Sequence, residues 1–300
     1  MIVALLPTQA LVDAVGPVDG VELVVWRGDG PPPRADEIDL LVLDYARSHA
    51  AMGALDAMPR LRVVQLQTAG YDGMLELTPD GVLLASARGV HDDATAELAL
   101  GLTIASLRGI DVAFRESGTW RQDTRRRSLA DSRVAILGYG SIGRAVAERM
   151  VACKAVVTGV ASTARDDDLV GRVVTADDVD WAAQHVVVVV LPLTDATRHV
   201  VDAEFLAGLS DDTLVVNVGR GPLLDTDAAL AEAGRLRFAL DVTDPEPLPE
   251  DHPLWTAPGV LVTPHIAGGT TAMLPRIGAL VRDQLERLRD DRPLRNVVAR

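Results

Sequence analysis

The stretch that decides the fold is Val134-Ala135-Ile136-Leu137-Gly138-Tyr139-Gly140-Ser141-Ile142-Gly143. A short apolar run of strand type leads into a G-x-G-x-x-G loop, and a helical pattern follows over Ile142–Met150. Glycines there permit a tight turn and a close backbone approach to a ligand, while the helix N-terminus offers free N–H groups. The motif alone is weak evidence, and a glycine turn that serves only packing is the alternative. In this context it predicts a pyrophosphate cradle made by Gly138, Gly140, Ser141, Ile142 and Gly143.

Apolar runs of strand length form two series along the chain. The first covers residues 2–6, 21–26, 40–43, 63–66 and 82–85, and the second covers residues 134–137, 156–160, 186–191, 214–218, 238–240 and 260–262. Both series alternate with helical patterns, and residues 186–190 are all valine, which suits a strand buried on both faces. The pattern predicts an α/β fold with two doubly wound parallel-sheet domains.

Two helical patterns lie outside these series and indicate how the domains are joined. Residues 94–107 follow the first series, and residues 270–289 follow the second with apolar side chains near one face. The economical interpretation is that both helices connect the domains and that the C-terminal one packs back on the first. We therefore expect one domain over residues 1–96 and 271–300, and the other over residues 97–270.

The composition argues against several classes of protein. A net charge of -14 disfavours nonspecific binding to nucleic acid or an anionic membrane. The one basic run, Arg125–Arg127, is expected to be a solvated surface segment. No apolar run approaches the roughly 20 residues that span a bilayer, and Ile2–Leu6 resembles a strand rather than a signal peptide. A single cysteine, Cys153, excludes an internal disulfide framework and a cysteine-based metal cluster. We expect a cytoplasmic protein without a metal.

The residues after the strand at 156–160 bear on the choice of nucleotide. NAD enzymes usually place a carboxylate there for the ribose hydroxyls, but residues 161–165 are Ala-Ser-Thr-Ala-Arg. Ser162, Thr163 and Arg165 can instead bind a 2′-phosphate, since an arginine–phosphate contact is among the stronger polar interactions. The sequence therefore favours NADP over NAD. The alternative is that Arg165 points to solvent.

Polar segments follow three later strands, at the edge where parallel sheets place their ligands. They are residues 217–221 (Asn-Val-Gly-Arg-Gly), 241–247 (Asp-Val-Thr-Asp-Pro-Glu-Pro) and 263–268 (Thr-Pro-His-Ile-Ala-Gly). These segments bring an arginine, Arg220, a glutamate, Glu246, and a histidine, His265, to one edge of the sheet. Each of these three residues, taken alone, has an ordinary explanation, such as a surface ion pair or a loop carboxylate. Asp244 is a second candidate for the role given to Glu246.

At this point the chain resembles the D-isomer-specific 2-hydroxyacid dehydrogenase family over almost its whole length. The resemblance adds residues 67–72 (Gln-Thr-Ala-Gly-Tyr-Asp), 94–97 (Ala-Thr-Ala-Glu) and 191–194 (Leu-Pro-Leu-Thr), in the family's order and spacing. It implies a flavodoxin-like substrate domain split around a Rossmann domain, and a homodimer. It also implies NAD(P)H-dependent reduction of a small 2-keto acid to the D-2-hydroxy acid.

The same resemblance assigns roles that chemistry supports. His265 resembles the proton donor and Glu246 the carboxylate that orients it, while Arg220 suits a carboxylate and a carbonyl together. Backbone N–H groups of Ala69 and Gly70 would bind the other end of the substrate carboxylate. The implied contacts with the cofactor also include Thr95, Leu191, Pro192, Thr194, Val218, Asp241, His265 and Gly268, with Asp241 and Thr194 beside the nicotinamide.

Departures from the family pattern bear on the substrate. His91 stands where asparagine is common, Val218-Gly219 replaces Thr-Ala, and Thr243 replaces an aromatic residue. The segment at 251–255 (Asp-His-Pro-Leu-Trp) resembles glyoxylate and hydroxypyruvate reductases. That substrate type is the leading hypothesis.

Three other functions remain open. A relative that acts on larger or phosphorylated hydroxy acids would be expected to carry a basic residue in segment 67–72, which has none. A dinucleotide-sensing protein similar to the family's corepressors needs no catalytic groups, yet this chain retains them. Oxidation of formate or phosphite shares the scaffold, but formate oxidation would call for a different set of side chains near the histidine.

Overall fold

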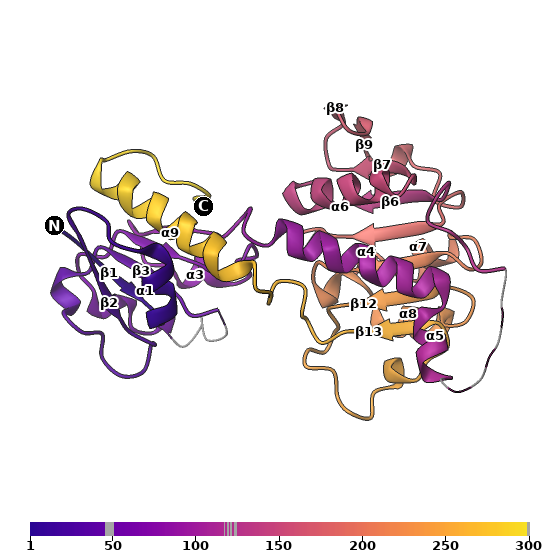
Figure 1. Ribbon diagram of the computed structural model, residues 1–300, viewed down its shortest axis with the longest axis horizontal. Helices are drawn as coiled ribbons and strands as arrows, with labels where there is room; N and C mark the ends of the chain where they lie inside the picture. Colours follow the sequence, from indigo (N-terminus) through magenta and orange to yellow (C-terminus); the bar gives the residue numbers. More distant parts are fainter. Residues whose placement is uncertain (46–50, 117, 119, 121, 123–124, 299–300) are drawn as a thin grey trace. The chain divides into compact units, whose positions relative to one another are not determined.

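The computed structural model describes residues 1–45, 51–116, 118, 120, 122 and 125–298, and it divides into two compact units. Unit 1 combines Met1–His91 with Thr270–Arg300, and unit 2 is Asp92–Gly269 (Figure 1). The expected boundaries, after residues 96 and 270, fall close to these divisions. Helix α4 (Asp92–Arg108) belongs to unit 2 over its whole length, so the first division precedes the helix rather than cutting it.

Unit 1 is built on a five-stranded parallel sheet in the order β2-β1-β3-β4-β5. The strands are β1 (Ile2–Leu6), β2 (Val21–Val25), β3 (Leu40–Val42), β4 (Val63–Gln65) and β5 (Leu83–Ala85). This order is that of flavodoxin-like doubly wound sheets. The expected fold class is confirmed for this unit.

The C-terminal helix completes the core of unit 1. Helix α9 (Met273–Arg289) contributes buried Ile277, Val281 and Leu285 to the cluster that also holds residues of α1 (Gln9–Val15) and β1. Gly278 allows the close approach, because a Cβ there would lie 2.8 Å from Cβ of Ala14. The unit also contains α3 (Met74–Leu77), η1 (Ala35–Glu37) and η2 (Leu55–Ala57). Helix α9 therefore stabilises unit 1.

Unit 2 contains an eight-stranded sheet in the order β13-β12-β11-β10-β6-β7-β9-β8. The strands are β6 (Arg133–Leu137), β7 (Val156–Val160), β8 (Arg165–Asp167), β9 (Gly171–Val174), β10 (Val186–Val189), β11 (Leu214–Asn217), β12 (Arg237–Leu240) and β13 (Val260–Val262). Only β8 runs antiparallel to its neighbour. The hairpin of β8 and β9 was not expected from the sequence, whereas the other six strands were.

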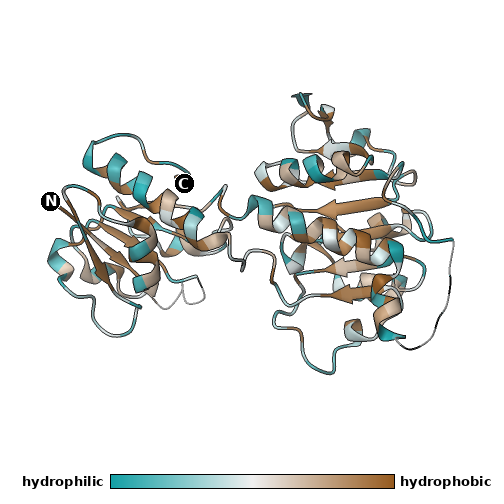
Figure 2. Cartoon of the chain, in the orientation of Figure 1, coloured by the Kyte–Doolittle hydropathy of each residue, from teal (hydrophilic) through white to brown (hydrophobic). Residues whose placement is uncertain are grey.

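Successive valine side chains of β10 point to opposite faces of this sheet, and each face is covered by helices. Val186 and Val188 pack with residues of α4 and α6 (Ser141–Ala152), while Val187 and Val189 pack with residues of α7 (Ala203–Ala207) and α8 (Thr226–Glu232). Strands buried on both faces are apolar throughout, which Figure 2 shows as continuous brown arrows. The described residues of the unit also form the short helices α5 (Ile110–Arg115), η3 (Ala176–Asp178), η4 (Gly221–Leu223) and η5 (Pro253–Trp255).

Among the described residues, no helix is both long and apolar enough to cross a membrane. The same part of the chain holds no cluster of three or more histidine, cysteine, aspartate and glutamate side chains that is suited to a metal ion.

Candidate active site

The glycine loop joins β6 to the N-terminus of α6, and its three glycines meet different surroundings. A Cβ on Gly138 would lie 2.7 Å from the carbonyl of Val190, and one on Gly143 would lie 2.1 Å from the carbonyl oxygen of Gly138. Gly140 precedes the first residue of α6 and has no heavy atom within 4 Å of the place where its Cβ would stand. Two glycines thus serve packing, and the third leaves open space at a helix N-terminus. That arrangement fits a pyrophosphate group.

Arg165 is exposed, and its guanidinium also lies beside this loop. Its Nη2 donates to the backbone oxygen of Tyr139 at 2.7 Å, and its Cζ is 5.8 Å from the centre of the Tyr139 ring. Ser162 and Thr163, at the end of β7, are exposed. Arg165 is therefore held next to the loop that follows β6, where an adenosine phosphate can reach it.

Hydrogen bonds that the sequence did not predict hold the side chain of Tyr139 in place. Its hydroxyl donates to Oδ1 of Asp167 at 3.0 Å, and Nη1 of Arg144 donates to Oδ2 of the same carboxylate at 2.8 Å. Burial, and then the hydrogen bond to Asp167, raise the pKa of Tyr139, so the phenol stays a donor. Asp167 also accepts from the N–H groups of Leu169 and Val170. The carboxylate of Asp167 is thus already engaged by protein groups.

The segment after β11 fixes the backbone around Arg220. Asn217 Nδ2 donates to the Arg220 carbonyl at 2.9 Å, and its Oδ1 accepts from the N–H of Gly219 at 3.1 Å. A Cβ on Gly221 would lie 1.8 Å from the carbonyl oxygen of Thr243. The loop that carries Arg220 therefore touches the loop that carries Glu246, and only glycine fits at the contact.

His265 and Glu246 form a hydrogen-bonded pair. The distance from Nδ1 of His265 to Oε1 of Glu246 is 2.6 Å. This hydrogen bond is the main reason that the pKa of His265 is raised; burial and the charge of Arg220 oppose it, and the charges of Glu246 and Asp241 add to it. The pKa of Glu246 is lowered, first by the same hydrogen bond. The competing residue, Asp244, instead accepts from Thr226 through its backbone oxygen.

Asp241 shapes the loop that presents His265. Its buried carboxylate accepts from Thr263 Oγ1 at 2.6 Å and from the N–H groups of Ile266 and Ala267 at 2.9 and 3.0 Å. Its backbone oxygen accepts from the N–H of His265 at 2.8 Å. His265 itself has a φ of 50°, an uncommon backbone conformation for a residue other than glycine. A contact of Asp241 with nicotinamide stays a prediction, and these contacts with the loop were not expected.

The remaining candidates of unit 2 lie around the same sheet. Leu191, Pro192 and Thr194 follow β10, and Thr194 Oγ1 is 3.0 Å from Thr197 Oγ1. Val218 follows β11, Gly268 lies three residues after His265, and Thr95 is buried in the first turns of α4. The positions of Leu191, Pro192, Thr194 and Val218 at carboxyl ends of strands are those that the sequence predicts.

Ala69 and Gly70 belong to unit 1, which the structure describes by itself. They follow β4, and Thr68 Oγ1 donates to the carbonyl of Gly70 at 2.7 Å. His91 Nε2 lies 2.6 Å from the carbonyl oxygen of Gln67, so the residue that replaces asparagine holds the start of this loop. The N–H groups of Ala69 and Gly70 donate to no other described residue. They are available to a carboxylate.

The chain is similar in sequence to several known proteins. The family model for the D-isomer specific 2-hydroxyacid dehydrogenase, NAD binding domain, matches residues 100–267. A glyoxylate reductase of Thermofilum pendens is 30% identical over 246 residues, which are 77% of this chain and 73% of that protein. A hydroxypyruvate reductase of Thermotoga maritima is 28% identical, over 81% of this chain and 82% of that protein.

A solved structure extends the likeness to both units. The NADPH-dependent glyoxylate/hydroxypyruvate reductase of Sinorhizobium meliloti, in complex with NADP and sulfate, has a TM-score of 0.82 and 27% identity. The match covers 99% of this chain and 97% of that one. The chain thus belongs to the D-isomer-specific 2-hydroxyacid dehydrogenase family, whose members are NAD(P)-dependent oxidoreductases of small 2-hydroxy and 2-keto acids.

Proposed function

We propose that this protein reduces a small 2-keto acid of the glyoxylate or hydroxypyruvate type to the D-2-hydroxy acid, with NADPH as the preferred donor. The observation that carries the proposal is the 2.6 Å contact between His265 and Glu246. It lies in the same unit as a glycine loop with open space at Gly140. Reduction of a keto acid needs a proton donor, a cation for the carboxylate and a place for the nucleotide.

Arg220 binds the substrate in this proposal. Its planar guanidinium has several N–H donors in a fixed fork, which matches a carboxylate with an adjacent carbonyl oxygen. The contact between Gly221 and Thr243 holds its loop in place. The N–H groups of Ala69 and Gly70 are proposed to bind the same carboxylate.

His265 supplies the proton. Glu246 accepts from Nδ1–H, so the other ring nitrogen, Nε2, is the one that gives its proton to the carbonyl oxygen of the substrate. The raised pKa of His265 keeps the ring charged to a higher pH than a free imidazole. In the reverse direction, neutral Nε2 accepts the hydroxyl proton.

NADPH, when bound, supplies the hydride that is added to the carbonyl carbon. The N–H groups at Gly140, Ser141 and Ile142 suit its pyrophosphate, with Gly138 and Gly143 shaping the turn. Ser162, Thr163 and Arg165 suit its 2′-phosphate. Thr95, Leu191, Pro192, Thr194, Val218, Asp241, His265 and Gly268 are proposed to contact the remainder of the cofactor.

We also propose that the protein is a homodimer joined through unit 2. Among the described residues of that unit, Phe114 is 77% exposed and Trp120 is 96% exposed. Contiguous exposed apolar surface commonly marks a contact with another chain, and we propose that these two side chains belong to such a surface. Light scattering of Phe114→Ser, which should yield monomers, tests this part separately.

The first experiment follows absorbance of the nicotinamide with purified protein. Glyoxylate, hydroxypyruvate, pyruvate, 3-phosphohydroxypyruvate and a branched 2-keto acid are each tested with NADPH and with NADH. We expect the fastest oxidation with NADPH and one of the two smallest polar acids. A preference for the phosphorylated acid would replace the proposed substrate. Tight nucleotide binding without turnover would favour a sensor.

Two matched variants test whether turnover depends on His265. His265 and His199 both have φ near 50°, a backbone conformation that asparagine tolerates. His265→Asn should lower kcat by roughly 10²- to 10⁴-fold, the range for loss of a general acid. His199→Asn should retain the activity of the parent protein. Equal activity of both variants would exclude His265 as the proton donor.

A further inference from the structure

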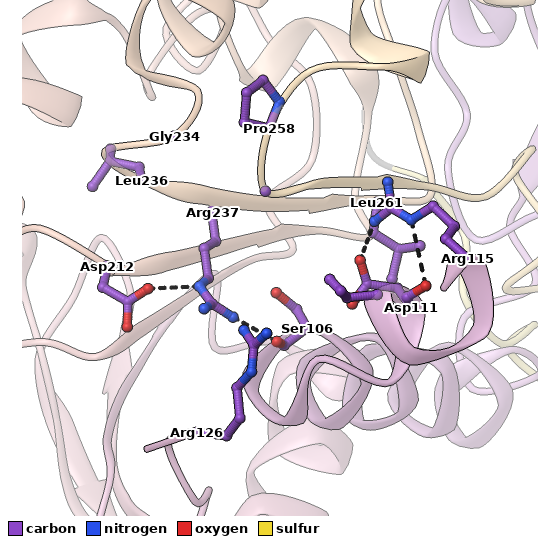
Figure 3. Close-up of a pocket in the computed structure, with 12 residues that line it drawn as sticks. Ser106, Asp111, Arg115, Arg126, Asp212, Gly234, Leu236, Arg237, Pro258 and Leu261 are labelled. Atoms are coloured by element: carbon purple, nitrogen blue, oxygen red, sulfur yellow. Dashed lines mark hydrogen bonds and ion pairs between the residues drawn. The ribbon is translucent and has the colours of Figure 1, made fainter. Parts of the chain in front are cut away.

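The arginines of unit 2 differ in how far the fold engages their charge. At the cavity in Figure 3, Arg237 donates to Asp212 at 2.6 Å. The basic run Arg125–Arg127 is less solvated than the sequence suggested, since its last two residues are partly buried. Arg165, in contrast, is exposed, and its guanidinium donates to the backbone oxygen of Tyr139. The position of Arg165 therefore depends on what holds the segment that carries it.

Strand β8, which begins at Arg165, is the outermost strand of its sheet. In the part of the chain that the structure describes, β8 pairs with β9 alone, and β9 pairs with β7 over residues 159–160 and 173–174. The main chain of β8 thus has no ladder with β6, from which the glycine loop extends. Side-chain contacts must therefore fix Arg165 relative to that loop.

Tyr139 of the glycine loop supplies contacts at both ends of β8. Arg165 and Asp167 are two residues apart in the strand, so their side chains point to the same face. Nη2 of Arg165 donates to the Tyr139 carbonyl at 2.7 Å, and the Tyr139 hydroxyl donates to Oδ1 of Asp167 at 3.0 Å. One residue of the loop therefore holds the first and the last residue of the strand.

The ring of Tyr139 is itself firmly seated. It is 3% exposed, and a Cβ on Gly159 of β7 would lie 2.5 Å from its Cδ2, so only glycine leaves room for the ring there. Cζ of Arg165 is 5.8 Å from the ring centre. Nη1 of Arg144, from α6, donates to the other oxygen of Asp167 at 2.8 Å. The hairpin of β8 and β9 is thus fastened to the loop through Tyr139 and to the helix through Arg144.

We propose that Tyr139 is a positioning residue for the choice of nucleotide: it holds β8 so that Arg165 reaches the 2′-phosphate of NADPH. This inference rests on the proposed use of NADPH and on the role given there to Arg165. The hydroxyl of Tyr139 is bound to Asp167 and its ring is buried, so its side chain acts through β8 and not by touching the phosphate. The effect of Tyr139 should therefore appear only with ligands that carry a 2′-phosphate.

Tyr139→Phe tests the inference, because it keeps the seated ring and removes the hydroxyl. Calorimetric titration with 2′,5′-ADP and with 5′-AMP needs no turnover. The variant should raise the Kd for 2′,5′-ADP by roughly three- to tenfold and leave that for 5′-AMP within about twofold. Asp168→Asn is the control, since Asp168 also binds Arg144 but not Tyr139, and both Kd values should stay within about twofold. Damage to the loop or to the fold would instead weaken both ligands alike.

The double variant with Arg165→Ala shows whether Tyr139 acts through Arg165. If it does, Tyr139→Phe should change the Kd for 2′,5′-ADP by less than about twofold once Arg165 is absent, although each single variant weakens binding. The inference is overturned if Tyr139→Phe leaves 2′,5′-ADP binding unchanged, weakens both ligands equally, or adds its full effect to that of Arg165→Ala. Binding of 2′,5′-ADP by Arg165→Ala that equals the parent protein's is a different failure, because it removes the proposed basis of the NADPH preference together with this inference.

Discussion

His265 Nδ1 lies 2.6 Å from Glu246 Oε1, so each residue sets the protonation of the other. The hydrogen bond raises the pKa of His265 and lowers that of Glu246. A proton donor with a raised pKa stays charged as the pH rises, and reduction of the keto acid persists to the pH at which the folded imidazole loses its proton.

Glu246→Gln is therefore expected to move the alkaline limb of the pH profile for reduction to lower pH, because the amide no longer stabilises the imidazolium. We expect kcat to fall at neutral pH by roughly 10²-fold, the effect of a misplaced general acid. The measurement is kcat/KM for reduction between pH 5 and pH 9. Asp244→Asn serves as the control, since its side chain has no hydrogen bond with His265. An unchanged alkaline limb in Glu246→Gln would assign the titration to another group.

Asp241→Asn tests whether the buried carboxylate acts through the loop or through the cofactor. An amide has one acceptor oxygen, so it cannot reproduce all three bonds to Thr263, Ile266 and Ala267. We expect a loss of about 1–3 kcal/mol of stability and a lower kcat, because His265 is displaced. The Kd for NADPH, measured by fluorescence, should change little. A large rise in that Kd with an unchanged melting temperature would instead favour a direct contact with nicotinamide.

Arg165→Ala is expected to weaken NADPH and spare NADH. Hydrogen bonds to charged groups contribute about 1.5–3 kcal/mol, which corresponds to a rise of roughly 10- to 100-fold in the KM for NADPH. Binding of 2′,5′-ADP and of 5′-AMP provides a readout that does not need turnover: only the first should weaken. If both ligands bind as before, Arg165 has no role in choosing the nucleotide, although it remains packed on Tyr139.

The sequence predicted those parts of the fold that depend on local periodicity. The valine strand at 186–190 and the amphipathic pattern of 270–289 each appear where expected, because burial on two faces or one face leaves a direct trace in the residue types. The order of polar segments also predicted that Arg220, Glu246 and His265 follow neighbouring strands. These features need no knowledge of how distant residues meet.

The contacts that the sequence could not reveal join residues far apart in the chain. Tyr139 and Asp167 meet because β8, a short polar strand without an apolar alternation, pairs with β9, which lies beside β7. Asp241 meets the N–H groups of residues 266 and 267 only after β13 has returned to the same edge. The partial burial of Arg127 depends on strand ends that lie side by side in the sheet and not in the sequence.

The glycine loop offers a last test, in which two similar substitutions should have different consequences. Gly143→Ala places a methyl group 2.1 Å from the Gly138 carbonyl oxygen, so α6 must move away from the loop, and we expect a loss of about 1–3 kcal/mol in stability. Gly140→Ala meets no heavy atom within 4 Å, and the φ of −89° at this position suits alanine. The folded protein should therefore keep its melting temperature, while the new methyl group occupies the space proposed for pyrophosphate and raises the Kd for NADPH by at least about tenfold. Thermal unfolding and nucleotide fluorescence measured on both variants separate the two effects. The space at Gly140 cannot hold both the new methyl group and a pyrophosphate. Normal NADPH binding by Gly140→Ala would therefore mean that the pyrophosphate lies elsewhere.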